Sequence, residues 1–318
     1  MTSEVTISAS ETSPEWTRPT PKSPVVQNYN HSLGGLNDRN MPREAETARF
    51  DSKAIPTDTV NVLDSKGDFI GGGTTGLVER LESGDVVKTA WTGRPTELDC
   101  KREIAIEAQI YDRLGAHRRL VPLKHWDPAS STLTLEYMPH GSLKEYVTKN
   151  IQHISPTQRR QWAAEAAEAI ELLHTRGVLQ ADVGPHNFLL DTELSLRICD
   201  FGGSSLDGSR AMVIPGVRYR LPSPAGRPVQ PTSVKEDLFG LGSTIYFIVT
   251  GHEPYAELGE DEDEVQKRYR DGVFPDLAGV PFGETIALCW RQEAESAGIV
   301  LELLRYPSSG TMFDRCKV

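Results

Sequence analysis

The sequence has few cysteines and no long apolar run. Its four cysteines, Cys100, Cys199, Cys289 and Cys316, are far apart, and no C-x-x-C pair occurs. That spacing suggests neither a zinc site nor a disulfide framework. The most apolar stretch, about residues 238–249, contains glycine and serine and is too short to span a bilayer. These absences predict an intracellular protein in a reducing compartment, cytoplasmic or nuclear, that is not embedded in a membrane.

Basic charge is also in short supply. The 318 residues include 34 Lys and Arg against 45 Asp and Glu, which gives a formal net charge of −11 and a pI near 5.3. Such a protein has no general affinity for nucleic acid or for an anionic membrane, so neither is expected as a partner. The densest charge run, residues 260–264, is itself acidic. We interpret it as a solvated loop or the start of a helix.

The N-terminal segment has little to bury. Residues 1–25 hold ten Ser or Thr and four Pro. They also lack the charged and apolar regions of a signal peptide. Residues 1–55 are therefore predicted to be a largely disordered Ser/Thr/Pro-rich tail, because too little apolar surface is available to offset the cost of ordering.

Secondary-structure signals divide the remaining chain into a β-rich part and a helical part. Residues 60–91 alternate short apolar runs with glycine and predict strands, as do residues 120–126 and 131–138. A helix is predicted from an N-cap at Thr96 to Leu114. Helices dominate after residue 142, with predicted spans at about 156–177 and 234–250 and more beyond residue 284. A cleft where the two parts meet, near residues 135–143, is a common place for a ligand.

Residues 71–78, GGGTTGLV, fit the pattern G-x-G-x-x-G-x-V. Glycines let a backbone approach phosphates closely and present its N–H groups. A dinucleotide-binding turn would be followed by a helix, whereas strand-like residues follow here. The pattern favours a hairpin flap over nucleotide phosphates, and a glycine-rich hairpin without a ligand is the alternative.

Lys88 lies in an apolar strand, where burial of an unpaired ammonium is costly. A partner acid is therefore expected. Glu107 is the candidate, because it shares a face of the predicted helix with apolar residues at helical spacing, Ile104, Ala108, Tyr111 and Leu114. Taken singly, Lys88 could be an edge lysine whose ammonium reaches water, and Glu107 a half-exposed surface acid. Taken together, the two charges predict an ion pair.

Residues 177–191, GVLQADVGPHNFLLD, place Asp182 and Asn187 on either side of a Gly-Pro turn, between two runs that predict short buried strands. The segment is either a plain hairpin or a platform that presents a carboxylate and an amide to a metal or a hydroxyl. Asp200 begins Asp-Phe-Gly, 13 residues after Asn187, at the end of another predicted strand. A carboxylate there could reach Mg²⁺ held by phosphates, since that ion prefers oxygen ligands.

In this order, the motifs resemble those of the eukaryotic protein kinase family. The resemblance covers about residues 65–305 and adds a hinge at residues 136–138, the segment DLFGLG from Asp237, and Cys289-Trp290. It implies an α+β, bilobal protein kinase-like fold with a small β-rich N-lobe at residues 56–136 and a larger helical C-lobe at residues 137–318. It also implies ATP and Mg²⁺ as cofactors and a protein as substrate.

The resemblance also implies roles for single residues. Asp182 would orient the attacking hydroxyl and accept its proton, Asn187 and Asp200 would hold Mg²⁺, and Lys88, held by Glu107, would contact the α- and β-phosphates. Asp237 would brace the backbone of the catalytic loop, and Leu135 would be the gatekeeper. The nucleotide would be bound by residues of the flap, the strands and the hinge, namely Gly71, Gly73, Gly76, Val78, Lys88, Glu136, Met138 and Leu189.

The sequence departs from the family pattern inside the catalytic loop. The usual His-Arg-Asp reads Gln180-Ala181-Asp182, which leaves no Arg to pair with a phosphorylated activation loop. Gly184 stands where most Ser/Thr-type members carry a Lys on the γ-phosphate, and the loss of such a contact typically costs about 10²–10³ in rate. A protonated His186 could substitute weakly.

A second departure lies at the end of the activation segment. The family's Ala-Pro-Glu reads Leu221-Pro222-Ser223, and Ala297 stands where the Arg partner of that Glu would be. Since both charges are missing together, neither is left buried alone. The change leaves the platform for a peptide substrate in question.

Three functions follow from these patterns. The favoured one is a protein kinase that phosphorylates Ser or Thr, with Tyr as the lesser choice, at full or low activity. The second is a nucleotide-binding pseudokinase or scaffold. The third is a small-molecule phosphotransferase of the aminoglycoside- or choline-kinase type, whose loop reads His-x-Asp-x-x-x-x-Asn.

Overall fold

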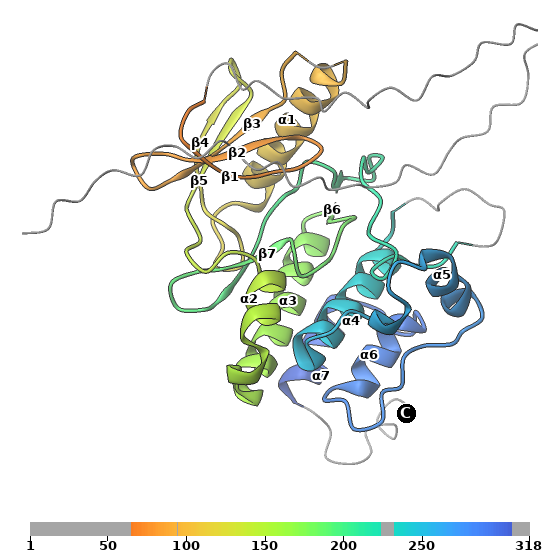
Figure 1. Ribbon diagram of the computed structural model, residues 1–318. Helices are drawn as coiled ribbons and strands as arrows, with labels where there is room; N and C mark the ends of the chain where they lie inside the picture. The colour runs from red at the N-terminus through yellow and green to blue at the C-terminus, as the bar shows by residue number, and fades with distance from the viewer. Residues whose placement is uncertain (1–64, 94, 224–231, 307–318) are drawn as a thin grey trace, which may run out of the picture. The chain divides into compact units, whose positions relative to one another are not determined.

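The computed structural model describes residues 65–93, 95–223 and 232–306. The predicted tail at residues 1–55 lies outside the described residues, and so does the start of the predicted N-lobe. A β-rich part is followed along the chain by a helical part (Figure 1). The predicted α+β fold with two lobes is confirmed.

Five antiparallel strands form the sheet of the N-terminal part, in the order β1-β2-β3-β5-β4. They are β1 (Asp68–Gly72), β2 (Gly76–Arg80), β3 (Val86–Ala90), β4 (Leu123–Asp127) and β5 (Thr132–Leu135). On β3, the middle strand, Lys88 is in register with Val78 of β2 and Leu133 of β5. The reading of Lys88 as an edge lysine is therefore wrong.

Helix α1 (Glu97–Leu114) packs against β3 and β5 (Figure 1). Its predicted inward face is confirmed, because Ile104, Ala108, Tyr111 and Leu114 are all buried. Glu107 is buried with them, so the reading of a half-exposed acid is wrong. The helix ends before Gly115, whose φ of 66° lies in the left-handed region that glycine adopts readily.

The side-chain N-cap predicted at Thr96, at the start of α1, is wrong. Thr96 has φ −90° and ψ 8°, and its side chain makes no capping hydrogen bond. That backbone conformation differs from the extended one from which an N-cap side chain reaches the first turn. Instead, Glu97 accepts a hydrogen bond from the Gly93 backbone N–H at 2.7 Å and so holds the loop before the helix.

Helices dominate the C-terminal part, where α3 packs against both α4 and α7, and α6 packs against α4. They are α2 (Leu143–Asn150), η1 (Ile151–His153), α3 (Pro156–Thr175), α4 (Val234–Thr250), η2 (Ala256–Leu258), α5 (Glu262–Arg270), α6 (Gly283–Trp290) and α7 (Ala297–Arg305). The predicted helices near residues 156–177 and 234–250 are confirmed. At the start of α3, the Ser155 hydroxyl accepts from the Gln158 backbone N–H at 3.1 Å, a standard N-cap.

Two short strand pairs flank the polar segments that contain Asp182 and Asp200. The first pairs β6 (Val178–Leu179) with β9 (Ser205–Leu206), and the second pairs β7 (Phe188–Leu190) with β8 (Leu196–Ile198). Val178, Phe188 and Leu190 are fully buried, as the apolar runs predict. Because β6 and β7 pair with other strands and not with each other, the reading of residues 177–191 as a plain hairpin is wrong.

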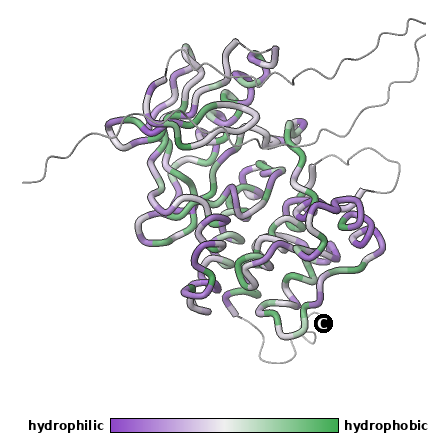
Figure 2. The backbone as a smooth tube through the Cα atoms, viewed as in Figure 1, coloured by the Kyte–Doolittle hydropathy of each residue, from purple (hydrophilic) through white to green (hydrophobic). Residues whose placement is uncertain are grey.

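The acidic run behaves as a solvated helix start. Residues 260–263 are exposed, and the Asp261 side chain caps α5 by accepting from the Glu264 backbone N–H at 3.0 Å. Figure 2 shows α5 as a strongly hydrophilic segment. Within residues 65–93, 95–223 and 232–306, no helix has both the length and the apolar character needed to cross a membrane.

Candidate active site

The loop between β6 and β7 brings the predicted acid and amide into contact. The Asn187 side-chain amide donates to the Asp182 backbone carbonyl at 2.9 Å and to its carboxylate at 3.1 Å. The Asn187 N–H also bonds the Gly184 carbonyl at 3.1 Å, which closes the turn. The Asp182 side chain is 21% exposed, so its carboxylate is held on one side and open to a substrate on the other.

His186 lies against the same carboxylate. Its Nε2 is 3.0 Å from Oδ2 of Asp182, and an ionised carboxylate can only accept, so the ring donates this hydrogen bond. Gly184 leaves room for the ring, since a Cβ built there would lie 2.5 Å from Cε1 of His186. The missing Lys at 184 and the histidine at 186 are therefore linked by packing.

Asp237, on α4, holds the backbone of the catalytic loop just before Asp182. Its buried carboxylate accepts from the backbone N–H groups of Gln180 at 2.8 Å and Ala181 at 2.9 Å. His174 on α3 lies 2.9 Å from the same carboxylate. Ala181 is held at φ 64°, a strained value for a residue with a side chain. The structural role that the resemblance implies for Asp237 is thus visible in its contacts.

Gln180 ties the catalytic loop to the Asp-Phe-Gly segment, a role that sequence reasoning missed. Its side-chain amide donates to the Asp200 carbonyl at 2.9 Å and to the Cys199 carbonyl at 3.3 Å. Asp200 itself has φ 62°, and Phe201 is buried edge-on against Tyr111 of α1, with ring centroids 5.2 Å apart. These contacts fix the direction in which the Asp200 carboxylate points.

Three charges from distant parts of the chain meet at Lys88. Its Nζ lies 2.7 Å from Glu107 Oε2 and 2.6 Å from Asp200 Oδ1. The predicted Lys88–Glu107 pair is confirmed, and Asp200 joins it. Burial alone would lower the pKa of Lys88, but the two carboxylates outweigh burial and raise it. The Lys88 ammonium in turn lowers the pKa of Asp200.

Burial raises the pKa of Glu107, although Lys88 opposes the shift. With both carboxylates ionised, the three groups carry one uncompensated negative charge. The Asp200 side chain is 49% exposed, so its carboxylate is accessible to a cation.

The donor set fits a magnesium–nucleotide complex. Asp200 supplies a carboxylate oxygen, and Asn187 supplies its amide oxygen because its NH₂ is engaged with Asp182. No group of three or more His, Cys, Asp or Glu residues suited to a metal ion occurs in the described part of the chain. A cation between Asn187 and Asp200 would therefore take its remaining ligands from phosphates and water.

The glycine-rich segment is a hairpin between β1 and β2, as predicted, and is closed by a Gly73 N–H bond to the Gly76 carbonyl at 3.0 Å. The three glycines of the G-x-G-x-x-G pattern, Gly71, Gly73 and Gly76, differ in their surroundings. A Cβ on Gly76 would lie 2.3 Å from the Thr89 carbonyl oxygen of β3. A Cβ on Gly71 or Gly73 would meet nothing within 4 Å, so their faces are open.

The predicted adenine contacts come from three elements. Val78 on β2 and Leu189 on β7 are half-buried. At the hinge, Glu136 is anchored by its N–H to the Pro122 carbonyl at 3.0 Å, and the Met138 carbonyl accepts from Gly141 at 3.2 Å. The Met138 N–H has no acceptor among the described residues and is able to donate to a ligand. The gatekeeper position, Leu135, is 8% exposed.

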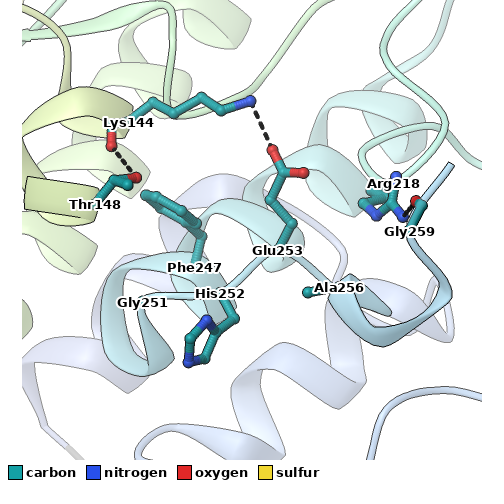
Figure 3. Close-up of a pocket in the computed structure, with 9 residues that line it drawn as sticks. All are labelled: Lys144, Thr148, Arg218, Phe247, Gly251, His252, Glu253, Ala256 and Gly259. Atoms are coloured by element: carbon teal, nitrogen blue, oxygen red, sulfur yellow. Dashed lines mark hydrogen bonds and ion pairs between the residues drawn. The ribbon is translucent and has the colours of Figure 1, made fainter.

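A cavity of about 270 Å³ lies between Lys144 and Thr148 of α2 and residues near the end of α4 (Figure 3). It connects to the catalytic loop through Lys144, whose backbone N–H bonds the Pro185 carbonyl at 3.0 Å. The Lys144 ammonium extends to Glu253 at 2.8 Å, and Arg218 donates to the carbonyls of Tyr255 and Gly259 (Figure 3).

Another anchor replaces the missing ion pair of the activation segment. The Glu236 carboxylate accepts from the Leu221 N–H at 2.9 Å, while Ala297 is buried at the start of α7. Burial raises the pKa of Glu236 to about 7, and this hydrogen bond opposes the shift. The segment end is therefore tied to α4 through a backbone group, which no motif in the sequence indicated.

Comparisons with known proteins agree with this site. A family profile described as "Protein kinase domain" matches residues 65–290. The serine/threonine-protein kinase AfsK of Streptomyces griseus is 34% identical over 162 residues, which are 49% of this chain and 19% of that protein. L-type lectin-domain containing receptor kinase S.1 of Arabidopsis thaliana is 31% identical over 175 residues, 52% of this chain and 26% of that protein.

Mitogen-activated protein kinase kinase kinase 17 of Arabidopsis thaliana is 23% identical over 190 residues, 55% of this chain and 49% of that protein. The chain thus spans less than half the length of each of these three curated relatives.

Proposed function

The chain belongs to the protein kinase family, and on that premise we propose that it transfers the γ-phosphate of Mg·ATP to a hydroxyl of a protein substrate. The observation that carries the proposal is that Lys88 Nζ lies within 2.7 Å of both the Glu107 and the Asp200 carboxylates. A lysine held between a buried carboxylate and a half-exposed one is fixed for phosphate binding.

The roles proposed for the loop follow from its hydrogen bonds. Asp182 orients the attacking hydroxyl and accepts its proton, while Asn187 and His186 hold the carboxylate in place. Bound Mg²⁺ would neutralise phosphate charge, with Asn187 and Asp200 as its protein ligands. Gly71, Gly73 and Gly76 cover the phosphates, Val78 and Leu189 enclose adenine, and backbone groups of Glu136 and Met138 bond its edge.

One observation supports Ser or Thr as the acceptor. The relative from Streptomyces griseus is named a serine/threonine-protein kinase. We further propose an intracellular location, cytoplasmic or nuclear, since Cys100, Cys199 and Cys289 are all unpaired and Cys316 lies outside the described residues.

The pseudokinase alternative rests on Gln180, Ala181 and Gly184. The contacts of Gln180 count against this alternative, because this side chain still joins the catalytic loop to Asp200. The small-molecule phosphotransferase is disfavoured by the flap and by the Asp-Phe-Gly segment, both of which follow the protein kinase pattern.

The test uses the full chain with Mg²⁺ and ATP labelled on the γ-phosphate. We expect label in the protein itself or in a mixture of soluble proteins, and a loss of about 10²–10⁴ in rate for Asp182→Asn. Asp112→Asn, an exposed carboxylate on α1, is the matched control and should leave the rate unchanged. Stabilisation of the folded chain by Mg·ATP without transfer of label to a protein would establish the pseudokinase. Label in small alcohols or amino sugars would establish the small-molecule phosphotransferase.

A further inference from the structure

The tip of the glycine flap consists of Gly73, Thr74 and Thr75, and the backbone carbonyl of each residue accepts a hydrogen bond from outside the flap. Trp91 donates from its indole Nε1 to the Gly73 carbonyl at 2.9 Å and from its backbone N–H to the Thr75 carbonyl at 3.3 Å. The thiol of Cys100, on α1, donates to the Thr74 carbonyl at 3.6 Å. Two residues outside the flap therefore hold three successive peptide groups.

These bonds set the direction of the flap's N–H groups. In a planar trans peptide, the N–H of one residue points opposite to the carbonyl of the residue before it. The N–H groups of Thr74 and Thr75 therefore point away from Trp91 and Cys100. Neither N–H has an acceptor among the described residues, so both are able to donate to an anion.

The flap tip also reaches the metal end of the site. Burial raises the pKa of Glu103 on α1, and the nearby Thr75 side chain opposes that shift. A Cβ built on Gly202 would lie 3.3 Å from Cγ2 of Thr75, so the tip rests directly against the Asp-Phe-Gly segment. The flap tip consequently lies beside the segment whose Asp200 carboxylate is proposed to face magnesium and phosphates.

We propose that Trp91, assisted by Cys100, is a positioning residue that latches the glycine flap with its N–H groups directed at the phosphates of the nucleotide. The inference rests on the proposed use of ATP. A flap that is already held in its binding geometry loses little conformational freedom when the nucleotide binds, and affinity rises accordingly. The latch acts on phosphates and not on adenine or ribose.

Isothermal titration calorimetry of the full chain with Mg·ATP and with adenosine tests the latch. Trp91→Phe keeps a large aromatic ring but removes the indole donor. We expect it to weaken Mg·ATP binding about threefold to tenfold, as the loss of one hydrogen bond would, and to leave adenosine binding unchanged. The matched control is Trp126→Phe, which alters a half-buried indole packed against the same small core cluster. Trp126 makes no described hydrogen bond to the flap.

The outcomes separate the latch from the proposed function. If the wild type binds no Mg·ATP, the proposed function fails and the latch fails with it. If the wild type binds but Trp91→Phe matches Trp126→Phe, or loses ATP and adenosine equally, the latch alone is overturned. If Trp91→Phe does not fold, Cys100→Ala supports the same comparison with Trp91 intact, and a selective loss of ATP affinity is again the expected result.

Discussion

Gly184 and His186 share one space in the catalytic loop. A Cβ on Gly184 would lie 2.5 Å from Cε1 and 2.7 Å from Nδ1 of the His186 ring. The ring that fills this space donates to Asp182 at 3.0 Å. A side chain at position 184 would displace the His186 ring that donates to Asp182. The absence of the family's lysine at 184 and the presence of a donor at 186 therefore depend on each other.

Gly184→Ala should displace His186 and lower kcat about threefold to tenfold, because the Asp182 carboxylate loses one of its charge-assisted hydrogen bonds. His186→Ala should lower kcat by a similar factor. If both changes act through the same contact, the double variant is no slower than His186→Ala alone. Steady-state kinetics on the four proteins would show this, and additive losses would contradict it.

Local patterns predict only part of this site. The pairing of Lys88 with Glu107 follows from sequence, because an inward-facing acid on an amphipathic helix and a lysine in a buried strand each require a partner. The addition of Asp200 at 2.6 Å does not follow, since it depends on how the two parts of the chain pack. The resemblance to a family brought Asp200 into the site.

Other features had no signal in the sequence. The tie from Gln180 to the Asp200 carbonyl and the bond from Leu221 to Glu236 both use backbone groups, which any residue provides. The flap contacts of Trp91 are of the same kind. The Thr96 cap was predicted from the local residue pattern and is wrong because the backbone at Thr96 is not extended.

The glycines of the flap should respond differently to alanine. Gly76→Ala places a methyl group 2.3 Å from the Thr89 carbonyl oxygen, so β2 and β3 must separate, at a cost of about 1–3 kcal/mol. Gly71→Ala and Gly73→Ala meet open space and should leave the melting temperature unchanged. Their methyl groups instead occupy the face proposed for phosphates and should raise the Kd for Mg·ATP. Equal melting temperatures for all three variants would contradict the packing role of Gly76.

Lys88→Met should destabilise the fold as well as abolish nucleotide binding. It leaves Glu107 fully buried without its counter-charge, which typically costs about 3–5 kcal/mol. Adding Glu107→Leu removes that unpaired charge and should restore most of the stability but no binding of ATP. Urea unfolding of the wild type and both variants measures the effect. A double variant no more stable than Lys88→Met would show that charge burial is not the cause.

Glu236 should make stability depend on pH below neutrality. Burial raises the pKa of this carboxyl to about 7 in the folded chain, against 4.5 for an ordinary glutamate, although the hydrogen bond from the Leu221 N–H opposes the shift. Below pH 4.5 the group is protonated in both states. As pH rises from 4.5 to 7, the unfolded chain releases this proton more readily than the folded chain does, so the stability from Glu236 falls. Above pH 7 no further change arises from this group.

Glu236→Gln keeps the acceptor for the Leu221 N–H but cannot ionise. Its melting temperature relative to the wild type should therefore climb between pH 4.5 and 7 and then stay level, with a gain in stability of up to about 3 kcal/mol at pH 8. Glu302→Gln, an exposed change on α7, is the control and should follow the wild-type profile. Scanning calorimetry at half-unit intervals would reveal the trend. Parallel curves for wild type and Glu236→Gln would mean that Glu236 ionises at little cost in folding free energy throughout this range.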